Sequence, residues 1–113
     1  MHAPCARDAP LVVPAPVEID MTVADDFAEA LSDAVATGPA CVVVDMSRTV
    51  FCDSSGIAAI MAALGQAGPE GPALVLAVPD AQVRRVLSLV GLDLLVPIHH
   101  DLDTALRGGS AAT

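Results

Sequence analysis

The tetrapeptide Asp53-Ser54-Ser55-Gly56 places two hydroxyl groups where an apolar helix should begin. Short polar side chains at such a position accept hydrogen bonds from the first free amides of a helix. The same amides and the positive end of the helix dipole favour an anion, so a phosphoryl group on Ser54 would fit this helix end. Taken alone, however, the tetrapeptide is more typical of a purely structural cap or turn.

The residues on either side of this motif predict a buried strand and an amphipathic helix. Residues 40–44 are a continuous apolar run, β-branched at its centre, which is typical of a parallel strand in the middle of a sheet. After the motif, apolar residues recur at i, i+3, i+4 and i+7 on one stripe of a helix that should end at about residue 64 or 65. This stripe consists of Ile57, Ile60, Met61 and Leu64.

Three more strands are predicted, at residues 11–19, 73–78 and 94–99. Prolines within the first and the last cannot donate to a ladder of hydrogen bonds, which places both strands at edges of the sheet. An exposed edge at 11–19 could pair with the same edge of a second copy. A monomer or a weak homodimer is therefore expected.

Three more helices are predicted, each from its start signal. Thr22 is the expected cap of the first, and Pro79 opens the second because proline favours the first helical turn. Asp101 should cap a short last helix that runs through Leu106. Alternating strands and helices predict an α/β fold, with a small, mixed or mainly parallel sheet covered by about four helices.

Length and composition agree with one compact domain. Of the 113 residues 54% are hydrophobic, which is enough for a two-layer core. The domain should span residues 10–107, between a flexible leader at 1–9 and a flexible tail at 108–113. The net charge of −9 repels nucleic acids and anionic lipid surfaces, and no apolar run could cross a bilayer.

Three cysteines, at positions 5, 41 and 52, are an odd number without a paired spacing. No secretory leader is recognised either, so a disulfide framework is not expected. The compartment that we expect is the cytoplasm.

The surroundings of the motif resemble the signature of the STAS domain, the anti-sigma factor antagonist family. Asp45 and Ser47 follow the buried strand, Phe51 precedes the motif, and Ile57 and Ile60 come after it. The match is specific, and it implies the STAS fold for residues 11–106.

A second part of the resemblance lies upstream, where residues 16–20 and Ala24 match the Gly-Glu-Leu-Asp strand end that leads into the family's first helix. Pro16 and Val17 replace the glycine of that pattern. The family often has a full extra strand before this point, and only about ten to fifteen residues precede it here. A shortened N-terminal strand is therefore expected.

The resemblance also implies a function. In that family the domain binds an anti-sigma factor that is a serine kinase of the histidine-kinase-like ATPase type, and the first serine of the motif is phosphorylated. In this sequence the resemblance implies that Ser54 is the phosphorylated residue, and Ser55 is the alternative acceptor. Phosphorylation would switch the antagonist off and so free or sequester a sigma factor by partner switching, and a phosphoserine phosphatase would reset the site. The expected partner-binding residues are Asp20, Asp45, Ser47, Asp53, Ser54, Ser55, Gly56 and Ile57.

Functions of two other classes compete with this one. The same fold could act as a non-switching scaffold or sensor subunit of a larger signalling or transport complex. An enzyme would need one serine of the pair as nucleophile and His99 or His100 as base, but the chain has no Gly-x-Ser-x-Gly elbow. The two histidines are instead expected to form a solvated turn.

A metal site at the same histidines is not expected. Asp101 and Asp103 follow His99 and His100, but adjacent histidines lack a credible inward-facing ligand spacing. The sequence therefore predicts no enzyme, no metal and no cofactor.

Overall fold

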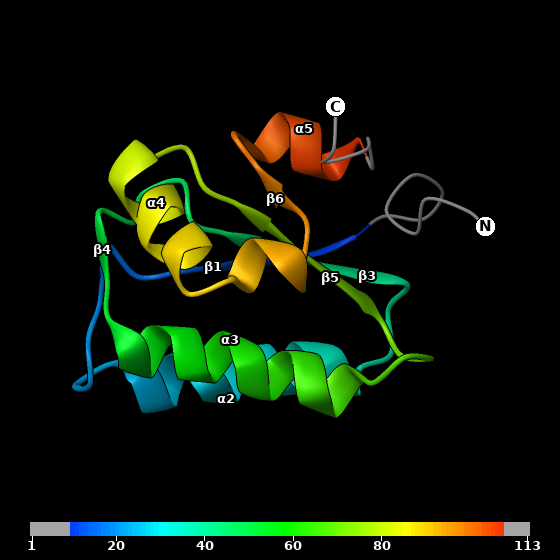
Figure 1. Cartoon of the computed structure of the whole chain (residues 1–113). Coiled ribbons are helices and arrows are strands. Elements are labelled where there is room, and N and C mark those ends of the chain that lie inside the picture. Colours follow the sequence, from blue (N-terminus) through cyan, green and yellow to red (C-terminus); the bar gives the residue numbers. More distant parts are fainter. Residues whose placement is uncertain (1–9, 108–113) are drawn as a thin grey trace.

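Parallel strands form the centre of the molecule. The computed structural model describes residues 10–107, so the expected leader and tail, and any strand before residue 10, lie outside the described residues. One sheet has the order β1-β3-β5-β6, and β2 and β4 form a separate pair (Figure 1). All of these pairings are parallel. The strands are β1 (Leu11–Pro14), β2 (Glu18–Ile19), β3 (Cys41–Asp45), β4 (Phe51–Cys52), β5 (Ala73–Ala77) and β6 (Ile98–His99).

Within residues 10–107, four α-helices and one 3-10 helix connect and cover these strands. Helices α2 and α3 lie side by side along one face of the sheet, whereas α5 lies on the opposite face (Figure 1). The predicted α/β class, the mainly parallel sheet and the four helices are thereby confirmed. The helices are α2 (Ala24–Ala36), α3 (Ser54–Ala67), α4 (Ala81–Leu89), η1 (Leu92–Leu94) and α5 (Leu102–Leu106).

The central strand β3 is buried on both faces, as its apolar run predicts. Successive side chains of a strand point to opposite faces. Val42 and Val44 accordingly join the larger core, which α2, α3 and α4 cover. Val43 instead joins a smaller cluster with Val75 beneath α5.

The predicted strand at residues 11–19 is divided into β1 and β2, which corrects the expectation of one continuous strand. Pro14 and Pro16 cannot donate backbone hydrogen bonds, so the ladder breaks between them. The buried Thr49 closes the gap, because its Oγ1 donates to the Pro16 carbonyl oxygen at 2.7 Å. Beyond the end of the main sheet, β2 and β4 pair as a two-stranded ribbon (Figure 1).

Two predicted helix starts are wrong, because the N-cap of α2 is Val23 and the N-cap of α4 is Asp80. Thr22 does not cap α2; its hydroxyl and amide both donate to Asp20 Oδ1. Pro79 lies before the next helix, and Asp80 caps that helix by accepting hydrogen bonds from the amides of residues 82 and 83. The predicted cap at Asp101 is confirmed, since it accepts from the Thr104 amide at 2.7 Å.

The last strand is shorter than predicted, because η1 occupies residues 92–94 and leaves Ile98–His99 as β6. Both β1 and β6 lie at edges, as expected. The expectation of a solvated turn is wrong for His99, whose side chain is 4% exposed. Removal from water disfavours the charged imidazolium and lowers the pKa of His99.

The cysteines also correct an expectation. Cys52 is a free, buried thiol, whereas Cys41 is disulfide-bonded. The sequence predicts no disulfide framework, and the disulfide at Cys41 departs from that expectation. Among residues 10–107, no helix combines the length and the apolar character needed to cross a membrane.

Replacing Thr49 with valine should destabilise the protein by about 1–3 kcal/mol, because the part-buried Pro16 carbonyl oxygen would lose its hydrogen bond from the buried Thr49. Urea unfolding measures the change. Thr49→Ser keeps the hydroxyl and should retain more of the stability. A valine variant as stable as the wild type would show that this bond does not hold the ribbon.

The stability of the protein should fall as the pH drops from about 7.5 to 5.5. The lowered pKa of His99 means that the unfolded chain binds a proton near pH 6.5 that the folded chain does not yet bind. Urea unfolding at both pH values should show a smaller fall for His99→Gln than for the wild type. The exposed His100 provides the control, and His100→Gln should keep the wild-type fall. An unchanged pH dependence in His99→Gln would contradict this assignment.

Candidate functional site

Three aspartates at the carboxyl ends of strands form turns of one kind. In each turn a carboxylate oxygen accepts hydrogen bonds from both the amide and the hydroxyl of the residue two positions later. Such turns satisfy backbone amides where a strand stops. The aspartates are Asp20, Asp45 and Asp53, and their partners are Thr22, Ser47 and Ser55.

Asp53 is also the N-cap of α3. Its Oδ1 accepts hydrogen bonds from the Ser55 amide at 2.9 Å and from the Gly56 amide at 3.4 Å. The Ser55 hydroxyl also donates to it, and this bond contributes most to lowering the pKa of Asp53. The helix therefore begins with an ionised carboxylate at its positive end.

The two serines of the motif differ in what surrounds them. Ser54 is the first residue of α3 and is exposed. Ser55 is half-buried, and its hydroxyl is engaged by Asp53. Within the described part of the chain, no recorded hydrogen bond involves the Ser54 hydroxyl. Of the pair, Ser54 has the hydroxyl that is free to accept a modifying group.

Gly56 holds the start of α3 directly against the ribbon. A Cβ atom at this position would lie 2.6 Å from Ile19 Cγ2 and 2.7 Å from Cys52 Sγ. Those two residues are paired in β2 and β4 and are buried. The next residue, Ile57, packs against the larger core. The position of Ser54 is thus set by a contact that leaves no room for a side chain.

Cys52 lies beside the motif as a protonated thiol. Burial is the main cause that raises its pKa to about 11, and the nearby Asp53 carboxylate adds to the effect. A thiol rather than a thiolate is present at neutral pH, and the thiol is a weak nucleophile. The role that its contacts assign to Cys52 is packing against Gly56.

The structure brings together some of the predicted partner-binding residues and separates others. Asp20 lies beside Asp53, because Ile19 pairs with Cys52 and the Asp53 amide donates to the Ile19 carbonyl oxygen at 3.0 Å. Asp45 ends β3 in the main sheet and forms its own turn with Ser47. In residues 10–107, no recorded hydrogen bond joins that turn to the motif.

Apolar side chains around the motif were missed by the sequence analysis. Met21 is 78% exposed, Val50 is 55% exposed and Phe51 is 49% exposed. The alternation of a strand that buries Cys52 could have indicated that Phe51 points outward.

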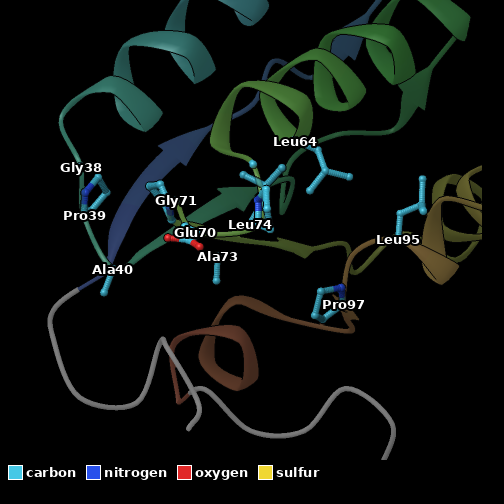
Figure 2. Close-up of a pocket in the computed structure, with 13 residues that line it drawn as sticks. Gly38, Pro39, Ala40, Leu64, Glu70, Gly71, Ala73, Leu74, Leu95 and Pro97 are labelled. Carbon is cyan, nitrogen blue, oxygen red and sulfur yellow. The ribbon is translucent and has the colours of Figure 1, made fainter. Parts of the chain in front are cut away.

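A hollow of about 1130 Å³ opens at the other end of α3 (Figure 2). Fourteen helical residues span about 20 Å, so the hollow is well separated from Ser54. Its walls include Leu64, Leu74 and Leu95, and Glu70 is the one charged residue among those that line it. Among the described residues, no group of three or more histidines, cysteines or acids could hold a metal ion.

Comparisons with known proteins agree with this fold and site. A family model described as the STAS domain matches residues 3–105. The anti-sigma-F factor antagonist RsfB of Mycobacterium tuberculosis is 33% identical over 95 residues, which cover 81% of this chain and 77% of the relative. An anti-sigma factor antagonist from Mycobacterium paratuberculosis has a crystal structure with a TM-score of 0.72 and 34% identity, covering 84% of this chain and 80% of that one.

A sulfate transporter family protein from Wolinella succinogenes has a similar structure, with a TM-score of 0.76 over 89% of this chain and 84% of that one. At 17% identity this likeness shows the fold alone. The family match establishes that the chain is a STAS domain protein. Within that family it belongs with the anti-sigma factor antagonists, to which its relatives of 33% and 34% identity are assigned. These regulatory relatives confirm that it is not an enzyme.

Two glycine substitutions within α3 should have opposite effects. Gly56→Ala should destabilise the protein by about 1–3 kcal/mol, because the new methyl group would overlap Ile19 and Cys52. Gly65→Ala is the matched control, since nothing lies within 4 Å of its added Cβ. It should stabilise by about 0.5–1 kcal/mol through helix propensity. Thermal or urea unfolding compares the two, and equal effects would contradict the tight contact at Gly56.

Proposed function

We propose that the protein is an anti-sigma factor antagonist that binds a serine-kinase anti-sigma factor of the histidine-kinase-like ATPase type. Phosphorylation of Ser54 switches the antagonist off, and a sigma factor is freed or sequestered by this change of partners. A phosphoserine phosphatase restores the unmodified form. The cytoplasm is the compartment in which we expect this exchange.

The observation that carries the proposal is the difference between the two serines. The Ser54 hydroxyl is exposed at the first turn of α3, where a kinase can reach it. The Ser55 hydroxyl is half-buried and donates to Asp53. Modification of Ser55 would first have to break that bond, which supports Ser54 as the acceptor.

Electrostatics supports release by phosphorylation. A phosphoryl group adds about −1.5 to −2 charges at neutral pH. At Ser54 this charge would stand next to the Asp53 carboxylate, with Asp20 beside it, in a protein of net charge −9. A partner that matches the unmodified face would meet an extra charge that costs energy to desolvate, and each 1.4 kcal/mol lost is about tenfold in affinity.

The proposal is tested with the purified serine-kinase anti-sigma factors of the source organism, measured one at a time by calorimetry and by mass spectrometry after ATP is added. One of them should bind the wild type and phosphorylate Ser54. Ser54→Ala should bind equally well and stay bound in ATP, whereas Ser54→Asp should bind at least about tenfold more weakly. Ser55→Ala is the control and should still be phosphorylated.

Two results would overturn the proposal. Absence of binding to every such factor would remove the partner. Equal binding by the wild type and Ser54→Asp would mean that the protein is a non-switching scaffold, and that the serine pair only begins a helix.

A further inference from the structure

The β2–β4 ribbon exposes a group of apolar side chains beside Ser54. We call these residues the ribbon patch, and each of them is more than 40% exposed. Val17 and Val50 are neighbours, because the Val50 amide donates to the Val17 carbonyl oxygen at 2.8 Å, and Phe51 is paired with Glu18 one position further along the ribbon. The members of the ribbon patch are Val17, Met21, Val50 and Phe51.

The exposure of Phe51 is imposed by the strand register. Ile19 and Cys52 point inward, where Gly56 packs closely against both of them. Alternation along each strand then turns Glu18 and Phe51 outward. Phe51 cannot be buried by turning the ribbon over, because Cys52 would then leave the contact that holds α3. One of the chain's two aromatic side chains is thus kept at the surface, three residues before Ser54.

Carboxylates surround the ribbon patch. Glu18 lies opposite Phe51, and Asp20 and Asp53 end the two strands of the ribbon. Hydrogen bonds from Thr22 lower the pKa of Asp20, as those from Ser55 do for Asp53, so both are ionised at neutral pH. Arg48 is the nearby cation in the sequence, two residues before Val50. The resulting surface has an apolar centre with a mostly acidic border.

We propose that the ribbon patch, with Phe51 as its aromatic member, is the apolar part of the surface that binds the anti-sigma factor; this inference rests on the proposed function. The complementary surface of the factor is an apolar depression with arginine or lysine side chains around it. Exposed apolar groups with a polar border are typical of binding sites, and aromatic anchors carry much of the binding energy in such interfaces. A phosphoryl group on Ser54 adds charge beside apolar side chains that lose their water when the partner binds.

A second exposed apolar group provides the matched control. It lies at the end of α4 and on η1, where Leu94 is 85% exposed and Leu89 is 74% exposed. Asp93 is the charged residue of η1, and the Ser88 hydroxyl donates to it at 3.1 Å. This group does not adjoin the motif in sequence, although α4 itself also contacts β4.

The test measures dissociation constants for the serine-kinase anti-sigma factor that binds the wild type. Phe51→Ala should raise the constant at least about tenfold, and Met21→Ser should raise it less. Leu94→Ser should change it by less than about threefold. Circular dichroism and urea unfolding of each variant establish that the fold is retained, so that the loss of binding reports on the interface.

The outcomes separate this inference from the function on which it rests. If Ser54→Asp weakens binding but Phe51→Ala does not, the ribbon patch is not the apolar centre, although the switch stands. If Leu94→Ser weakens binding instead, the surface at α4 and η1 is the docking face and the inference is overturned. Light scattering measures whether the protein forms a dimer. A dimer that Phe51→Ala dissociates would mean that a second copy, and not the anti-sigma factor, covers the ribbon patch, and this would overturn the inference. Absence of any binding by the wild type defeats the proposed function itself.

Discussion

The contact between Gly56 and the β2–β4 ribbon is the constraint on which the motif depends. The first turn of α3 comes so close to Ile19 and Cys52 that a methyl group would overlap both. The ribbon itself is tied to the sheet across a break by the Thr49 hydroxyl. Together these contacts hold the ribbon and the first turn of α3 against each other, and this sets where Ser54 lies.

The N-terminus of α3 is already neutralised by Asp53 before any modification. The helix dipole therefore offers less to a phosphate than a helix end whose amides are all free. A phosphoryl group on Ser54 would act mainly on what approaches the surface. This arrangement suits a regulator whose two states have one backbone structure and differ in surface charge.

Much of the fold follows from the sequence, and the differences have local causes. Buried apolar runs such as residues 40–44 predict the central strand because only a strand covered on both faces needs them. Helix starts at Thr22 and Pro79 are wrong because Asp20 draws Thr22 into a turn before α2, and because Asp80 binds the first amides of α4. Met61, predicted to be on the inner stripe of α3, is 42% exposed, since Gly56, Ala59 and Ala63 allow close packing on a different side.

The candidate site was predictable only in part, for a similar reason. The motif predicts a capped helix start, but which serine is free depends on the hydrogen bond between Ser55 and Asp53. The exposure of Phe51 depends on register. On the far side of the sheet, the five residues of α5 are the described helix over Val43 and Val75. So short a cover buries few side chains, so local opening of α5 should cost less free energy than opening of the larger core beneath α2 and α3.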